Sequence, residues 1–327
     1  MAASPLKGLL DKRNIALTRA KLRAWWEGVE YDEAAAVAAF EAANDAAPAT
    51  EGADEQLFDA LPYDMPARLT ALAALWGEGR VRPGAMTADA APLILLNVEE
   101  AGVLAVLSPG MQAPVATLAQ QHSGKIQVFE WRDETLEALK HGMKSAGLDE
   151  RVSISRIDLE AHVFTQAAFD GLISTDDFAY CGHPPHLAQQ IMKALKPGAC
   201  AVIDAYVGLP IAELNTAFAS AFAEPQIRAH GDLLQVFKET GLALESDEDI
   251  TESFLDLARA GFKGLGDRLT ADTLNVGAAQ ELAWEAQAWR VRMKLMTQRR
   301  LERRRFVVRR PKEAPATPAP APEAQNP

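Results

Sequence analysis

The sequence predicts an α/β protein in which a mostly parallel sheet is covered by helices on both faces. Short apolar runs recur between residues 103 and 203, and segments with helical periodicity separate them. Glycine and proline mark the junctions between the two kinds of segment. Buried strands that alternate with helices are typical of parallel sheets, because the crossover helices cover both faces.

Five apolar runs are the predicted strands of this alternating region, and three helices lie between them. The strands are expected at 103–107, 126–129, 152–157, 169–173 and 201–203, and the helices at 114–121, 133–146 and 184–195. A helix at 230–239, a strand at 242–244, a long helix at 279–304 and a short strand at 306–308 follow. We expect the last strand to pair antiparallel at the end of the sheet.

The N-terminal third is predicted to be helical. Helical periodicity covers residues 7–26, 33–44 and 66–76, and a segment rich in Ala, Pro and Gly at 46–56 indicates a linker. The sequence therefore predicts a helical extension over residues 1–92 and an α/β domain over 93–312. The tail, residues 313–327, is mostly Pro, Ala and Glu and is expected to be disordered.

Composition limits the class of protein. The 327 residues are 48% hydrophobic and 24% charged, as in ordinary globular proteins. No apolar run approaches the roughly 20 residues that span a bilayer, and the N-terminus lacks the pattern of a signal peptide. The two cysteines, Cys181 and Cys200, exclude a disulfide framework. These features favour a cytoplasmic protein.

Charge is distributed unevenly along the chain. The net charge is −12, yet residues 290–312 hold eleven basic side chains against the single acid Glu302. An acidic body repels nucleic acid and anionic membranes, so this basic helix is the candidate for an anionic contact. The other interpretation is an arginine-rich segment that neutralises the protein's own acidic body.

A candidate cofactor loop follows the first predicted strand of the sheet. The strand 103–107 runs into Ser108-Pro109-Gly110 and then a helix, which is how nucleotide-cofactor domains begin. Glu130 ends the next strand, 20 residues after Gly110. At that spacing an acid binds the ribose hydroxyls of a cofactor, because one carboxylate can accept from both.

Several further segments carry a resemblance to a known family. They are Phe169-Asp170-Gly171-Leu172, Leu195-Lys196-Pro197-Gly198, Glu248-Asp249-Ile250-Thr251 and the upstream Leu75-Trp76-Gly77. Together with the element order, they resemble the class I S-adenosylmethionine-dependent methyltransferase family over roughly residues 66–310. The resemblance implies a seven-stranded Rossmann-like methyltransferase fold behind a helical N-terminal extension.

The resemblance also assigns cofactor-binding residues. It implies S-adenosylmethionine as the cofactor, held by the loop residues Ser108 and Gly110. Glu130 would bind the ribose, Asp158 would lie beside the adenine amino group, and Ser174 would lie near the transferring methyl.

The first loop departs from the family pattern. It retains one glycine, Gly110, while Pro109 removes an N–H donor and Met111 and Gln112 add bulk. This first cofactor-binding motif is therefore degenerate.

Polar residues after the fourth predicted strand are candidates for the acceptor side. Asp176, Asp177, Tyr180 and His183 are expected to line the substrate mouth, with Asp176 and His183 as catalytic residues. His183 suits a base because an imidazole titrates near neutrality. A loop of satisfied polar groups before a helix is the other interpretation. Cys181, His183 and His186 do not supply the convergent ligand set of a metal site.

Two functions remain open on the sequence alone. The first is a methyltransferase that acts on a small-molecule or lipid-like acceptor, favoured by Glu130 and Asp158. The second is a non-catalytic descendant, a pseudoenzyme that serves as a platform for a protein partner through its basic helix or N-terminal helices. The degenerate loop favours the second.

Overall fold

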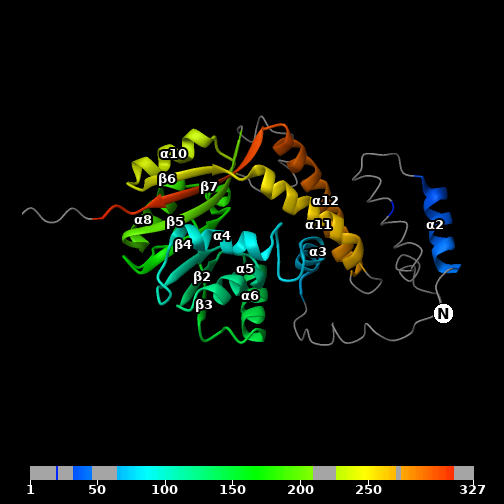
Figure 1. Cartoon of the computed structure of the whole chain (residues 1–327), viewed down its shortest axis with the longest axis horizontal. Coiled ribbons are helices and arrows are strands. Elements are labelled where there is room, and N and C mark those ends of the chain that lie inside the picture. The colour runs from blue at the N-terminus through cyan, green and yellow to red at the C-terminus, as the bar shows by residue number, and fades with distance from the viewer. Residues whose placement is uncertain (1–19, 21–31, 46–64, 209–225, 270–273, 313–327) are drawn as a thin grey trace, which may run out of the picture.

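A computed structural model describes residue 20 and residues 32–45, 65–208, 226–269 and 274–312 (Figure 1). Its centre is one seven-stranded sheet with the strand order β3-β2-β1-β4-β5-β7-β6. The first five strands are parallel, and β7 is antiparallel to both β5 and β6. The predicted α/β class, the parallel sheet and the antiparallel last strand are all confirmed.

The strands end together at one edge of the sheet. Their bounds are β1 Leu104–Leu107, β2 Ile126–Glu130, β3 Val152–Arg156, β4 Phe169–Thr175, β5 Leu195–Gly208, β6 Ala243–Asp249 and β7 Leu301–Arg309. Leu107 pairs in register with Phe129 on one side and with Ser174 on the other. The residues that follow, Ser108, Glu130 and Thr175, therefore emerge side by side, as the parallel arrangement requires.

Helices cover both faces of the sheet and form a separate group beside it (Figure 1). Their bounds are α2 Glu33–Asp45, α3 Ala67–Trp76, α4 Met86–Leu96, α5 Gln112–Gln121, α6 Asp133–Ser145, α7 Asp177–Tyr180, α8 Pro184–Ala194, α10 His230–Glu239, α11 Thr251–Arg268 and α12 Val276–Thr297. Alternate strand residues face opposite layers. Leu107 packs in a cluster with residues of α8 and α10, and Val106 packs with α5 and α6.

The third helical group consists of α3, α11 and α12. Trp76 at the end of α3 packs edge-on against Phe262, at 5.5 Å between ring centroids, and against Trp289, at 4.7 Å. A β-carbon at Gly261 would overlap the Trp76 ring, so this glycine allows α11 to approach α3 closely. The group forms one apolar cluster beside the sheet, and it supplies one wall of the site described below.

Two predicted boundaries near the C-terminus are wrong. The long helix expected at 279–304 ends at Thr297, and the strand expected at 306–308 runs over Leu301–Arg309. The reason is tertiary pairing, since nine residues of β7 form a continuous ladder with β5. The sequence analysis also missed α4, which contains Pro92, and α11, which contains three glycines.

The basic segment 290–312 is not a single solvent-exposed helix, so the expected basic helix is corrected. Nine of its residues form strand β7, where arginines pair with acids of neighbouring strands. Arg304 meets Asp247 and Arg305 meets Asp204, each at 2.7 Å, and Arg309 meets Glu245. These arginines neutralise the protein's own carboxylates.

Other predictions concern the N-terminal region and the tail. The helices at 33–44 and 66–76 are confirmed as α2 and α3. The proposed domain boundary after residue 92 falls inside α4. The predicted helix 7–26, linker 46–56 and tail 313–327 lie outside the described residues. Within the described ranges, no helix is both long and apolar enough to cross a membrane.

Candidate functional site

The loop after β1 turns sharply below the carboxyl edge of the sheet. Ser108 and Gly110 both have positive φ, 49° and 83°, and Met111 is buried. A β-carbon at Gly110 would overlap Val81, so both the backbone conformation and the space require glycine. The backbone N–H of Gly110 donates to Glu130 Oε2 at 3.1 Å. The loop after β1 and the acid that ends β2 are therefore in direct contact.

Glu130 is fully buried, and its carboxylate is bound by its own chain. Oε1 accepts from the backbone N–H groups of Trp131 and Arg132, both at 3.1 Å. The Arg132 side chain adds Nε to Oε1 at 2.8 Å and Nη2 to Oε2 at 3.0 Å. Burial alone would raise the pKa of Glu130, but the charge and hydrogen bonds of Arg132 lower it below its ordinary value.

Ser108 and Ser174 meet on a second buried acid, Asp177. The Ser108 hydroxyl donates to Oδ1, and the Ser174 hydroxyl donates to Oδ2 at 2.6 Å. All three side chains are buried, and burial raises the pKa of Asp177. Two predicted cofactor-binding residues are therefore brought together, but both hydroxyls are bonded to the buried Asp177.

Asp176 lies between two arginines that the sequence analysis missed. Its Oδ2 accepts from Arg82 Nη1 at 3.0 Å, and its Oδ1 accepts from Arg303 Nη1. Arg82 also donates to the backbone carbonyl oxygens of Ser108 and of Thr175, the latter at 3.4 Å. Arg82 thus bridges the ends of β1 and β4. Its only sequence signal is its place before Pro83-Gly84, and Arg303 was hidden within the basic run.

Charge repulsion is evident among these arginines. Burial lowers the pKa of Arg82, and the nearby Arg132 lowers it further. Burial lowers the pKa of Arg303 well below its ordinary value, and Arg82 and Arg305 contribute. Guanidinium groups gathered in this way attract anions.

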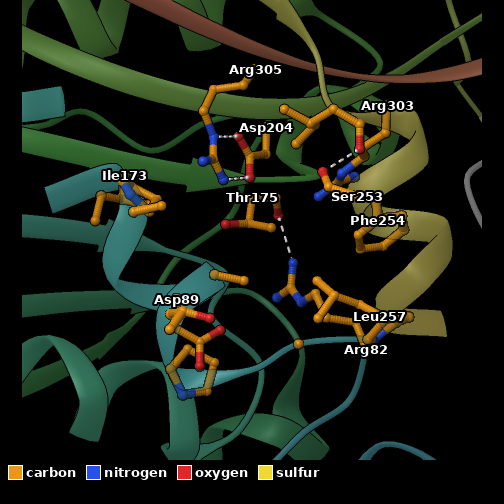
Figure 2. A pocket seen from close by; sticks show the side chains of 18 of the residues that line it. Arg82, Asp89, Ile173, Thr175, Asp204, Ser253, Phe254, Leu257, Arg303 and Arg305 are labelled. Carbon is orange, nitrogen blue, oxygen red and sulfur yellow. Dashed lines mark hydrogen bonds and ion pairs between the residues drawn. The ribbon is translucent and has the colours of Figure 1, made fainter. Parts of the chain in front are cut away.

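Two cavities meet at Arg82, which lines both. The Arg132 cavity, of about 580 Å³, lies among α3, α6, α7 and α12, and its polar lining includes Arg132, Asp176, Tyr180 and Arg292. The Arg303 cavity, of about 400 Å³, lies between α4, α11 and the ends of β4 and β5 (Figure 2). Both volumes suit a small-molecule ligand.

Of the residues predicted to bind the cofactor or to act in catalysis, only Asp176 lines either of these cavities, and two of the others, Asp158 and His183, lie at the exposed surface. Asp158 is exposed, and its Oδ1 accepts from the backbone N–H of Glu160 at 2.9 Å. His183 is exposed at the start of α8, where its Nδ1 accepts from the backbone N–H of His186 at 3.2 Å. That is a helix N-cap, which agrees with the alternative of satisfied polar groups before a helix.

Cys181, two residues before His183, has the surroundings of an unreactive structural thiol. It is buried, and burial raises the pKa of its thiol to about 11. Among the described residues, no group of three or more His, Cys, Asp or Glu side chains could hold a metal ion.

The strand order, the antiparallel β7 and the loop-to-acid contact at the carboxyl edge can now be compared with solved structures. Phosphoethanolamine N-methyltransferase 2 from Haemonchus contortus, solved with S-adenosyl-L-methionine, superposes with a TM-score of 0.63. The chain has the class I methyltransferase fold. Sequence identity to that structure is 19%, and the match covers 74% of this chain and 56% of the other.

Two other solved structures share the methyltransferase fold. The cyclase SpnF matches with a TM-score of 0.56 and 16% identity, over 76% of this chain and 98% of that one. Geranyl diphosphate C-methyltransferase from Streptomyces coelicolor A3(2) matches with a TM-score of 0.52 and 11% identity, over 68% and 75%. No protein-family profile and no curated protein sequence matches this chain. The fold thus accommodates more than one activity.

Proposed function

We propose that the chain binds S-adenosylmethionine beside Glu130, in the Arg132 cavity, and transfers its methyl group to a small-molecule acceptor. One observation carries the proposal. A buried acid ends β2 and accepts a hydrogen bond from Gly110 in the loop after β1, at the edge where this fold binds cofactors. The solved neighbours with S-adenosylmethionine or its product add support.

Arg132 must leave Glu130 before a ribose can bind there. It donates two N–H groups to the carboxylate, at 2.8 and 3.0 Å, and two ribose hydroxyls would replace them one for one. The Arg132 side chain is 26% exposed, and it lines the cavity, whereas Glu130 does not. A long side chain at the cavity wall can move aside without rearrangement of the backbone.

Asp176 remains our candidate on the acceptor side. It lines the Arg132 cavity and is held by Arg82 and Arg303, so its carboxylate is fixed in place. Bound S-adenosylmethionine would supply the methyl group: the acceptor's lone pair would bond to the methyl carbon as the carbon–sulfur bond breaks, sulfur would keep that bond's electron pair, and a proton on the acceptor would pass to water. The residues therefore mainly align the two reactants. His183 is not retained, because it caps α8 outside both cavities.

The second candidate is that the chain is a non-catalytic protein of the same fold, in which the cofactor site is closed. The observation that favours it is the Glu130–Arg132 pair, which holds both carboxylate oxygens. The loop with one glycine also favours it. Such a protein would act through a partner, and its Arg132 would never leave Glu130.

Calorimetric titration with S-adenosylmethionine and S-adenosylhomocysteine separates the two candidates. We expect both ligands to bind the wild type, and Glu130→Gln to weaken binding by tenfold or more. Glu137→Gln is the matched control, because Glu137 is exposed on α6. Circular dichroism checks that each variant is folded. Absence of binding at millimolar ligand would reject the methyltransferase and leave the second candidate.

A further inference from the structure

The Arg303 cavity combines an apolar wall with a concentration of guanidinium groups (Figure 2). Its apolar lining comes from α4, α5, α11 and strands β1 and β4, and it includes Pro92, Val106, Leu118, Ile173, Phe254 and Leu257. Its cationic lining is Arg82, Arg303 and Arg305. A pocket built in this way suits a molecule with one charged end and one apolar end.

Most carboxylates at this cavity are already paired. Asp204 forms two hydrogen bonds with Arg305, both at 2.7 Å, and Figure 2 shows this pair at the cavity wall. Asp89 forms two with Arg80, at 3.1 and 2.6 Å. These two acids therefore neutralise two cations. The remaining acid in the lining, Glu248, is exposed.

Arg82 and Arg303 share one carboxylate, that of Asp176. The next acid, Asp177, accepts from the hydroxyls of Ser108 and Ser174. Two guanidinium groups therefore share the one carboxylate of Asp176. A buried charge is costly unless a counter-charge and hydrogen bonds compensate it.

Arg303 shows that the compensation is incomplete. Its side chain is 2% exposed, and its Nε has no hydrogen-bond partner among the described residues. The rings of Tyr206 and Phe254 flank the guanidinium, with centroids at 4.5 and 4.8 Å from Cζ. An apolar flank lowers the local dielectric and strengthens the attraction for an anion.

We propose that the Arg303 cavity binds a small amphipathic anion, with a carboxylate or phosphate group at Arg82 and Arg303 and an apolar body against Leu118 and Ile173. Because Arg82 lines both cavities, the charged end of this ligand lies next to the Arg132 cavity. The ligand is then the methyl acceptor. That last identification rests on the proposed function, whereas the anion site does not.

Titrations without cofactor test the anion site. The probes are hexanoate, hexyl phosphate and hexanol, and binding is followed by calorimetry with the full chain. We expect hexanoate or hexyl phosphate to bind the wild type at least tenfold more tightly than hexanol. Arg303→Met should abolish that preference, and it leaves Asp176 paired with Arg82. Arg309→Met is the matched control on β7, because Arg309 pairs with Glu245 away from the cavity.

A second pair of variants tests the site without removing a buried arginine. Ser253 lines the cavity from α11 and is exposed, so changes there are tolerated by the fold. Ser253→Asp adds a negative charge and should weaken hexanoate binding about tenfold relative to Ser253→Asn. Equal binding of hexanoate and hexanol by the wild type, or equal hexanoate affinities of Ser253→Asp and Ser253→Asn, would overturn the proposal.

Failure of the proposed function gives a different result. If S-adenosylmethionine does not bind but hexanoate binds through Arg303, the anion site stands and its ligand is not a methyl acceptor. If S-adenosylmethionine binds and the anion preference is absent, the methyltransferase proposal stands and the anion site is rejected.

Discussion

The ladder of β7 with its two neighbouring strands and the group of Arg82, Arg303 and Asp176 at the carboxyl edge use the same residue types in different proportions. On the ladder, Arg304, Arg305 and Arg309 each meet a carboxylate of a neighbouring strand. At the edge, Arg82 and Arg303 share Asp176. On the ladder each guanidinium has its own carboxylate, whereas at the edge two guanidinium groups share one.

Burial differs most between one ladder pair, Arg309–Glu245, and the Arg303–Asp176 pair, and the other two ladder pairs lie between them. The Arg309 and Glu245 side chains are 40% and 38% exposed, whereas those of Arg303 and Asp176 are 2% and 13% exposed. Exposed ion pairs contribute little to stability because water screens them. A buried pair costs much when one partner is removed, since the other charge stays buried.

The largest expected effect follows from removal of the shared carboxylate. Asp176→Ala leaves Arg82 and Arg303 without it and should lower the free energy of unfolding by about 3–5 kcal/mol. The matched change on the ladder, Glu245→Ala, should cost no more than about 1 kcal/mol. Urea unfolding at pH 7 measures both. Equal losses would contradict the distinction between the two regions.

Two glycines offer a second comparison, between the loop of the site and an exposed turn. Gly110→Ala should destabilise by about 2–4 kcal/mol, because its φ is positive and the new methyl group would overlap Val81. Gly147 also has positive φ but open space around it, so Gly147→Ala should cost about 1 kcal/mol. Thermal unfolding of both variants checks the difference, and similar losses would show that Val81 adjusts.

Two buried acids at the carboxyl edge, Glu130 and Asp177, should respond to pH in opposite directions. Burial raises the pKa of Glu130, but Arg132 outweighs it and the net shift is downward. Its contribution to stability is present above the ordinary value of about 4.3 and is lost as pH falls through the folded pKa. Burial raises the pKa of Asp177, so its contribution is present below about 3.9 and is lost as pH rises through the folded pKa.

Denaturation of Glu130→Gln and Asp177→Asn at pH 7 and at about pH 4 tests these signs. The stability lost in Glu130→Gln relative to wild type should shrink at the lower pH. For Asp177→Asn the change should be opposite: the free energy of unfolding of the wild type should rise relative to that of the variant as pH falls. Parallel shifts of both variants would refute the assignment.

The smallest effect concerns the thiols, which lie outside the cluster. Burial raises the pKa of Cys181 and of Cys200 to about 11. Because the thiolate is the reactive form, both should react slowly with a maleimide at pH 8 in the native protein. Both should react rapidly in urea. Fast native labelling of either thiol would show that its surroundings open.

The sequence was sufficient for the fold because local patterns and topology agree. Apolar runs with period and length suited to strands identified β1 to β5, and the element order identified the antiparallel β7. It failed where tertiary contacts decide. Strand β7 takes residues that continue a helical pattern, and Gly261 lies in α11 because Trp76 packs against it.

The site was predictable only in part. The nearness of Glu130 and Gly110 follows from their spacing, which reports a fixed loop and strand geometry, and their role in cofactor binding stays a prediction. Arg82 and Arg303 were missed because their partners are distant in sequence. Arg132 was missed because its contact with Glu130, two residues away, depends on the direction of its side chain. Arg303 and Asp176 are 127 residues apart, and nothing local joins them. His183 was selected on chemistry alone, and its N-cap role depends on the backbone of α8.

Arg132 decides between an open and a closed cofactor site, so its removal tests the central claim most directly. The measurement is the affinity of S-adenosylhomocysteine for wild type and for Arg132→Ala, by calorimetry under the same conditions. If Arg132 covers the ribose site, as its bonds to Glu130 indicate, Arg132→Ala should bind at least tenfold more tightly. Binding that is absent from both proteins, or weaker in Arg132→Ala, would contradict the account.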